Sequence, residues 1–316
     1  MKITQIQALA SVQDLGRYGL RRLGIGHAGA MDALALRAGN VLLGNAENAA
    51  AVEVVLGGLT IEFQHDTHFC ITGAIYEATL NDSPVHSYWR YAAKKGQVLR
   101  LVRAVQGMYG YLCVQGGIEV PKVLGSRSTD LKAAFGGLEG RALKAGDVLP
   151  TSAAHSTGSG QGGIALPQIG IAPIALTNVI HAVPSAEYDS FSKPAQYRFW
   201  QDAWTLQSDS NRMGYRFSGG ELNQKKKTEM LSHAVGFGTV QVPPSGQPII
   251  LMADTQTTGG YPKIAAIAHA DLGRLAQLRF GSKVRFQMVT PEQAAKLQQK
   301  DEVYLNQIRK IVQNAS

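Results

Sequence analysis

Short apolar segments separated by turn residues dominate the chain. In the second half, four apolar residues follow Pro248 at 249–252, and residues 283–289 alternate so that Val284, Phe286 and Met288 share one face. Apolar runs of this length, bounded by turn signals, are typical of strands, and many of them with few helices indicate a barrel or sandwich. We therefore predict a mainly β protein. The first half contributes further expected strands at 52–55, 59–63, 69–72, 98–102 and 109–114.

A few segments instead show helical spacing. Asp32 is suited to cap a helix over 33–43, and a second short helix is expected near 187–200. Thr290-Pro291-Glu292-Gln293 is a capping box with proline at the first helical position, so we predict a C-terminal helix that runs to about residue 312.

Composition changes sharply at one place. Residues 151–163, TSAAHSTGSGQGG, are rich in Ser and Gly and have no apolar periodicity. Such a segment is typical of a linker or exposed loop. We therefore predict a first β-barrel-like domain over 1–150, a linker over 151–163, a second such domain over 164–290 and a terminal helix over 291–316.

The net charge of +8 raises the question of a polyanionic partner. The basic residues are scattered except at 225–227, without interleaved aromatic residues, so we expect no nucleic acid but an anionic small substrate. Cys70 and Cys113 lie in apolar surroundings, which suggests buried, reduced thiols and a cytoplasmic protein. No apolar stretch approaches the length of a membrane span, and we expect no membrane association.

The densest polar cluster is at 241–265, QVPPSGQPIILMADTQTTGGYPKIA. A strand that ends in an acid and a Gly-rich polar loop is suited to present side chains at a site, although an ordinary hairpin with solvated loops gives the same pattern. We predict that Asp254 acts as a general base or holds a metal or the substrate amide, and that Tyr261 and Lys263 donate to a developing oxyanion. The substrate would contact Gln241, Gln247, Gln256, Thr257 and Thr258.

A second polar segment, SDSNRMGYR at 208–216, places Arg212 and Arg216 four residues apart. Paired guanidinium groups can hold a carboxylate or phosphate, while the alternative is a surface strand with its own salt bridges. We assign Asn211, Arg212 and Arg216 to substrate binding, together with Arg127.

Other motifs are weak or missing. Glu229, Ser232 and His233 could suggest a catalytic triad, but spacing alone is little evidence. The chain has no GxxxxGK[ST] phosphate loop and no biotin-attachment motif, and His65-x-x-His68 does not make a metal site, so we expect no bound metal.

Five separated motifs, in one order, resemble the allophanate-hydrolase subunit 2 family: 11–19, 27–45, 125–141, 208–216 and 241–265. That family includes the C subunits of bacterial 5-oxoprolinases, KipA-type proteins and half of the carboxyltransferase part of urea carboxylase. The resemblance spans almost the whole chain and is strongest to the C subunits. It implies two linked, cyclophilin-like β-barrel domains.

The resemblance also implies a function. The chain would belong to a complex that opens 5-oxoproline to L-glutamate with ATP, bound with Mg²⁺ and held by this chain or by a partner. The expected partners are a KipI-like B subunit (allophanate hydrolase subunit 1) and a LamB/YcsF-like A subunit. One alternative is the carboxyltransferase half of a urea or amide carboxylase, which would use biotin on another chain. Another is a KipA-type regulator that binds a KipI-like kinase inhibitor. For the enzyme, we expect Asp254→Ala to abolish activity without unfolding the protein.

Overall fold

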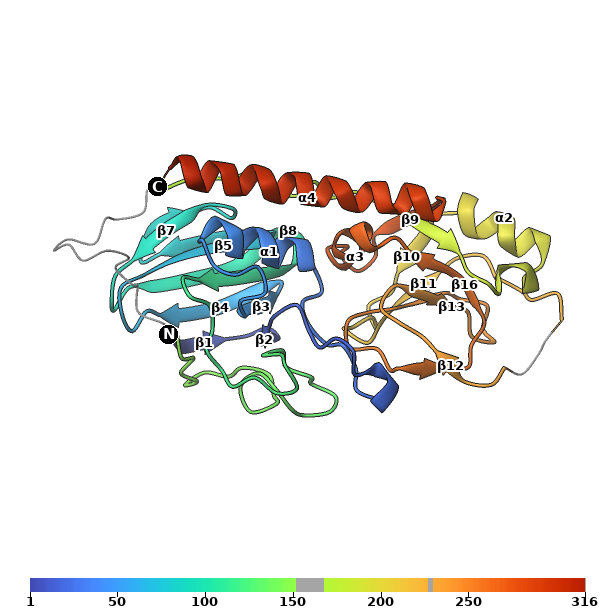
Figure 1. The fold of residues 1–316 in the computed structure, drawn as a ribbon, viewed down its shortest axis with the longest axis horizontal. Coiled ribbons are helices and arrows are strands. Elements are labelled where there is room, and N and C mark those ends of the chain that lie inside the picture. The colour runs from blue at the N-terminus through green and yellow to red at the C-terminus, as the bar shows by residue number, and fades with distance from the viewer. Residues whose placement is uncertain (152–167, 227–229, 316) are drawn as a thin grey trace. The chain divides into compact units, whose positions relative to one another are not determined.

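The computed structural model describes residues 1–151, 168–226 and 230–315 (Figure 1). Apart from Thr151, the predicted linker lies outside the described residues, as do Lys227 and Glu229. The chain forms two compact units. The first contains Met1–Arg17, Ala28–Ala175 and Glu302–Ser316, and the second contains Tyr18–His27 and Leu176–Asp301.

An eight-stranded sheet is the framework of the first unit. Its strands follow the order β1-β4-β8-β3-β2, and β5 pairs with β6, β7 and β8. The bounds are β1 (Lys2–Ile6), β2 (Ala10–Gln13), β3 (Ala51–Val55), β4 (Gly57–Glu62), β5 (Thr67–Leu80), β6 (Ser83–Val85), β7 (Arg90–Ala93) and β8 (Val98–Val114). The helix α1 (Ala33–Leu42) packs against β5 and β8 (Figure 1). Asp32 caps it by accepting a hydrogen bond from the Ala35 amide at 3.0 Å, which confirms the predicted N-terminus.

The two long strands β5 and β8 pair antiparallel from Phe69↔Val114 to Leu80↔Leu99, with register shifts between residues 73 and 78. These irregularities bend the sheet around an apolar core. Gly110 is required at the bend, because a Cβ there would lie 2.2 Å from the ring of Tyr76. The Tyr76 hydroxyl reaches past this glycine to the carbonyl of Val54 at 2.9 Å.

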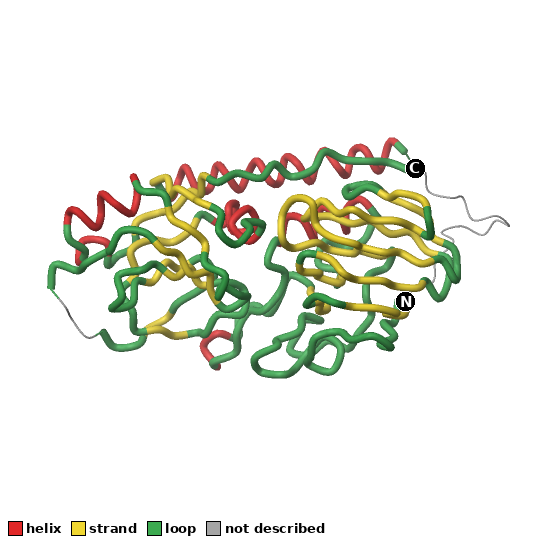
Figure 2. The backbone as a smooth tube through the Cα atoms, turned by 180° about the vertical axis from the view of Figure 1, so that it is seen from behind, coloured by secondary structure: helices red, strands yellow, loops and turns green. Residues whose placement is uncertain are grey.

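Residues 115–151 follow β8 as loops with a few isolated bridges, drawn green in Figure 2. Asp14 fixes this segment. One carboxylate oxygen accepts from the hydroxyls of Ser126 and Ser128, both at 2.6 Å, and the other accepts from the Arg127 amide at 2.6 Å. Two of the separated sequence motifs, 11–19 and 125–141, therefore meet through a buried carboxylate.

The second unit contains a closed barrel with the strand order β10-β11-β14-β13-β16-β9-β17. Its strands are β9 (Val179–Pro184), β10 (Trp204–Leu206), β11 (Gly214–Ser218), β13 (Thr239–Gln241), β14 (Ile249–Leu251), β16 (Lys263–Ile267) and β17 (Lys283–Met288). A separate two-stranded ribbon joins β12 (His233–Ala234) to β15 (Thr258–Gly259). The shorter elements are η1 (Arg21–Leu23), η2 (Tyr188–Ser190), α2 (Lys193–Gln201), η3 (His269–Asp271) and α3 (Leu272–Ala276).

Aromatic side chains fill the barrel. Phe286 of β17 stacks on Phe199 of α2 with ring centroids 4.8 Å apart and meets Phe217 of β11 edge-on at 5.9 Å. Such pairs add about 0.5–1.5 kcal/mol beyond the burial of their area. Met288 was expected on the same face as Phe286, but it ends the strand with 47% of its surface exposed.

The chain ends in α4 (Pro291–Asn314). Thr290 Oγ1 accepts from the Gln293 amide at 3.2 Å, and the Gln293 side chain accepts from the Thr290 amide at 2.8 Å, so the predicted capping box is confirmed. The predicted mainly β architecture with barrel-like units and a terminal helix is also confirmed. No helix of the described residues is long and apolar enough to cross a membrane.

Candidate functional site

Asp254, the predicted general base, is bound to Arg212 in the second unit. Arg212 Nε donates to one carboxylate oxygen at 2.9 Å and Nη2 donates to the other at 2.7 Å. Both side chains are nearly buried, with 5% and 3% of their surface exposed. The Asp254 amide also donates to the Arg212 carbonyl at 2.8 Å. This pair therefore joins the end of β14 to the turn before β11, and both carboxylate oxygens are already engaged.

The other residues of the polar segment at 208–216 are also engaged. Asn211 accepts from the Met213 amide at 2.8 Å and so shapes the turn. Arg216 pairs with Asp209 at 3.2 Å on the exposed surface, where such pairs stabilise little. Arg127 belongs to the first unit, where Nε donates to the Val120 carbonyl at 2.9 Å.

The Gly-rich loop after Asp254 forms one strand of the β12–β15 ribbon. His233 pairs with Gly259 and Ala234 with Thr258, while the Val235 amide donates to the Thr257 carbonyl at 3.1 Å. Gln256 and Thr258 are exposed, and Thr257 is half-buried. Three of the predicted contact residues are therefore presented on one short ribbon.

Gln241 lies directly beneath this ribbon, with 2% of its surface exposed. A Cβ at Gly259 would lie only 2.6 Å from Gln241 Nε2, so the ribbon approaches this amide closely because residue 259 has no side chain. The side-chain amide of Gln247 bonds Gly219 rather than the ribbon. Its Oε1 accepts from the Gly219 amide at 2.8 Å, and its Nε2 donates to the Gly219 carbonyl at 3.3 Å.

Lys263, the first residue of β16, is the centre of a charged cluster. Its ammonium donates to the Tyr261 carbonyl at 3.1 Å and lies 3.5 Å from both Glu187 Oε1 and His233 Nδ1. The other oxygen of Glu187 accepts from the Lys263 amide at 2.7 Å. His233 Nε2 lies 2.8 Å from Glu187 Oε1, so the carboxylate joins β16 to the ribbon. The Tyr261 side chain is available at the surface, with 47% exposure.

Sequence reasoning missed Glu187. It lies 46 residues from His233 and 76 from Lys263, within a segment that carries no motif, so no local signal indicated it. His233 was considered only with Ser232 and Glu229. Glu229 lies outside the described residues, and the acid that contacts His233 is Glu187.

Arg21 is the second missed residue. It lies on η1, in the short segment Tyr18–His27 that belongs to the second unit. Its Nη2 donates to the carbonyls of Val235 and Gln256, the latter at 3.3 Å. Burial lowers the pKa of this guanidinium from its usual value, which still leaves it charged at neutral pH.

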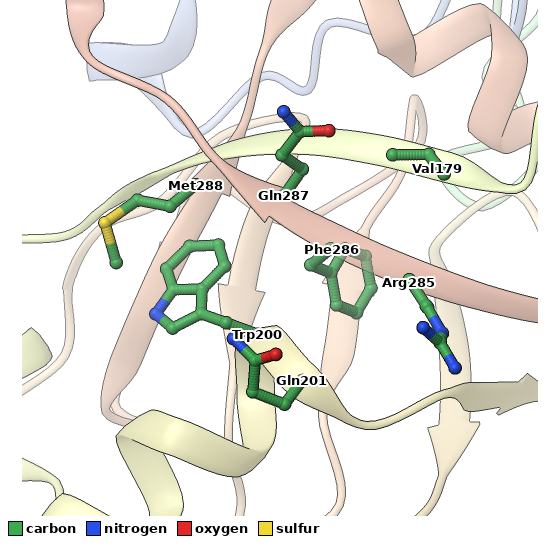
Figure 3. Close-up of a pocket in the computed structure, with 7 residues that line it drawn as sticks. All are labelled: Val179, Trp200, Gln201, Arg285, Phe286, Gln287 and Met288. Atoms are coloured by element: carbon green, nitrogen blue, oxygen red, sulfur yellow. The ribbon is translucent and has the colours of Figure 1, made fainter.

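A shallow hollow of about 390 Å³ lies elsewhere on the second unit (Figure 3). None of the predicted site residues lines it. Its lining comes from the start of β9, the end of α2 and β17: Val179, Trp200, Gln201, Arg285, Phe286, Gln287 and Met288. Among the residues that the structure describes, no three His, Cys, Asp or Glu side chains are grouped closely enough to hold a metal ion.

Residues 23–288 match the family model described as "Carboxyltransferase domain, subdomain A and B". The chain belongs to this carboxyltransferase-domain family. The match confirms the resemblance drawn from the five motifs, because it spans most of the chain and both units.

The chain is also similar to named proteins. The chain is 60% identical to the C subunit of 5-oxoprolinase from Haemophilus influenzae over 98% of both chains. It is 46% identical to that of Escherichia coli over 98% of this chain and 97% of the relative. Among solved structures, the K. lactis urea amidolyase is similar with a TM-score of 0.89 at 28% identity, over 97% of this chain and 20% of that protein.

Proposed function

We propose that this chain is the C subunit of an ATP-dependent 5-oxoprolinase, which opens 5-oxoproline to L-glutamate with hydrolysis of ATP. The observation that carries the proposal is full-length identity of 60% and 46% to two proteins named as the C subunits of 5-oxoprolinases. The name of these relatives implies further subunits. We propose as partners the KipI-like B and LamB/YcsF-like A subunits, with Mg²⁺ and ATP bound by one of them, since this chain has no GxxxxGK[ST] loop.

The chemistry explains why ATP is needed. A five-membered lactam is an amide with a poor leaving group, and phosphorylation of its carbonyl oxygen would provide a better one. Water then adds to the carbonyl carbon, the ring C–N bond breaks as the nitrogen takes up a proton, and a second water hydrolyses the resulting acyl phosphate to L-glutamate and inorganic phosphate. The role of this chain is to bind and orient the lactam, because orientation and charge stabilisation are what a polar ribbon can supply.

We assign these contacts to the ribbon and the cluster beneath it. The side chains of Gln256, Thr257 and Thr258 offer donors and acceptors to the lactam amide, and Tyr261 offers an exposed hydroxyl. Lys263 supplies positive charge from below, held in place by Glu187. We assign Asp254 to holding the loop in position, since each of its carboxylate oxygens accepts from Arg212.

The two free cysteines, both buried, fit a reducing compartment, so we propose that the complex works in the cytoplasm. One alternative has an observation in its favour. The urea amidolyase similarity and the carboxyltransferase family model fit transfer of a carboxyl group from biotin on another chain to urea or a related amide. The same ribbon would serve, because urea and a lactam present similar N–H and C=O groups.

The deciding experiment is glutamate formation from 5-oxoproline, ATP and Mg²⁺ by this chain mixed with the A and B subunits, each omitted in turn. We expect turnover only with all three, coupled to ADP release. Turnover by the two partners alone would contradict the proposal. A complex that assembles but forms glutamate in no mixture would favour the carboxyl-transfer alternative, which is tested with carboxybiotin and urea.

A further inference from the structure

One arginine joins both strands of the β12–β15 ribbon. Val235 directly follows β12 and Gln256 lies two residues before β15. The carbonyls of both accept from Arg21 Nη2. Arg21 is separated from these residues by 214 and 235 positions in the sequence. A residue from the beginning of the chain therefore lies at the base of the loop that presents Gln256, Thr257 and Thr258.

The remaining donors of Arg21 point to a ligand. A guanidinium has five N–H groups, and Arg21 uses only those of Nη2; among the described residues, Nε and Nη1 have no hydrogen-bond partner. No carboxylate of the described residues pairs with Arg21 either. A half-buried guanidinium without a counter-ion is stabilised by any anion that can approach it.

The arginines first considered for this task are in a different situation. Arg212 is paired with the buried Asp254, Arg216 is paired with Asp209, and Arg127 donates to a backbone carbonyl in the first unit. Arg21 differs from these three because it donates to two backbone carbonyls of the ribbon that carries Gln256, Thr257 and Thr258.

We propose that Arg21 binds the carboxylate of the substrate at the ribbon. This rests on the proposed function, in which the substrate 5-oxoproline carries a carboxylate on the ring carbon next to the lactam nitrogen. Nε or Nη1 of Arg21 donates to the carboxylate, while the ribbon side chains face the lactam amide. Arg21 would thus select an anionic lactam over a neutral one.

The test compares Arg21→Met with Arg22→Met in the assembled complex. Arg22 is the adjacent residue, is exposed and makes no hydrogen bond among the described residues, so it is a matched control for charge and position. We expect Arg21→Met to raise KM for 5-oxoproline about ten- to a hundredfold, the effect of losing a hydrogen bond to a charged group. Arg22→Met should leave KM within about twofold, and Arg21→Lys, which keeps the charge, should lie between the two.

A neutral analogue separates carboxylate binding from loop positioning. 2-Pyrrolidinone has the lactam but no carboxylate, and we expect its inhibition constant to be the same for the Arg21→Met and unsubstituted complexes. If Arg21→Met weakens the binding of 5-oxoproline and of 2-pyrrolidinone equally, Arg21 only shapes the loop and the proposal is wrong. If KM rises for ATP instead of 5-oxoproline, the anion is a phosphate and the proposal is again wrong.

A binding measurement keeps the inference separate from the proposed reaction. Saturation-transfer NMR of 5-oxoproline with the assembled complex, without ATP, requires no turnover. Binding of 5-oxoproline that is lost in Arg21→Met and kept in Arg22→Met, while 2-pyrrolidinone binds both equally, supports the assignment even if no glutamate forms. The assignment of Arg21 is overturned if 5-oxoproline still binds the Arg21→Met complex, or if it does not bind the unsubstituted complex. Thermal unfolding of each variant shows whether a loss reflects the fold.

Discussion

Arg212 and Asp254 form a two-point ion pair in which each carboxylate oxygen accepts a hydrogen bond, at 2.9 and 2.7 Å, and both side chains are shielded from water. The pair follows directly from two features of the sequence: an arginine in the turn before β11 and an acid just after β14, strands that are neighbours in the barrel. The ion pair fixes Asp254, the first residue of the polar loop that follows β14.

Removing one member of this pair should lower the stability of the protein. We expect Asp254→Ala or Arg212→Met to lower the free energy of unfolding by about 3–5 kcal/mol, because the remaining charge stays buried after the ion pair is broken. Urea denaturation measures the effect. That Asp254→Ala abolishes activity stays a prediction from the sequence, and turnover of the same variant tests it.

The double variant Arg212→Met/Asp254→Leu is the control, since it leaves no uncompensated charge. It should be more stable than either single variant. A single Asp254→Ala variant as stable as the unsubstituted protein would contradict a structural role for the pair.

Gly259→Ala should disturb the ribbon from below. The new Cβ would lie 2.6 Å from Nε2 of the buried Gln241, so this amide or the ribbon must shift, and we expect a loss of about 1–3 kcal/mol and weaker substrate binding. Gly236→Ala is the matched control, because its Cβ would meet no atom within 4 Å. Thermal unfolding and the KM of the complex for 5-oxoproline are measured for both variants.

Gln241→Ala in the Gly259→Ala background should recover part of the lost stability, because it removes the atom that the methyl group meets. Equal destabilisation by Gly259→Ala and Gly236→Ala would show that the ribbon does not depend on this close approach.

Glu187→Gln tests the charged cluster. The substitution keeps the shape but removes the negative charge beside Lys263 and His233, so we expect unfolding to require about 1–3 kcal/mol less and kcat of the complex to fall. Glu221→Gln, at an exposed position of the same unit, should change neither. A fully stable and fully active Glu187→Gln complex would remove the cluster from both roles.

The thiols predict a dependence on alkaline pH. Burial, with a smaller effect of the neighbouring Cys113, raises the pKa of Cys70 well above its usual range. The unfolded state therefore releases this proton first, and the stability contributed by the neutral thiol is present below about pH 8.5 and declines above it. The free energy of unfolding should fall between about pH 8.5 and 10, by at most about 1.4 kcal/mol per pH unit for this group.

Cys70→Ala should reduce that slope, measured by urea denaturation at each pH. A thiol reagent such as DTNB should label the native protein slowly and the unfolded protein at once, since Cys70 and Cys113 are both buried. Rapid labelling of the native protein would contradict the burial of both thiols.

Local sequence signals predicted the local structure well. Asp32 and Thr290 start helices as expected, because a cap depends only on residues three positions away. The apolar pattern likewise predicted the β class. The pairing of strands could not be read from it, since strand order is set by contacts between distant segments.

The site shows the same limit. The polar character of Gln256, Thr257 and Thr258 was visible in the sequence, but Glu187 and Arg21 were not, because each reaches the ribbon or Lys263 across a long separation. The role of Asp254 was open for a related reason. An acid that ends a strand looks the same in sequence whether its partner is a substrate or an arginine 42 residues away.

The separation of Arg21 and Gln256 along the sequence also sets an order of events during synthesis. At about 5–20 residues per second, the 235 residues between them take on the order of ten to fifty seconds to be made. Until then the segment Tyr18–His27 has no ribbon to bind, although the strands on either side of it already have neighbours to pair with. The second unit therefore cannot be completed from the C-terminal half of the gene alone, and a fragment that begins at Leu176 would fold, if at all, without Arg21.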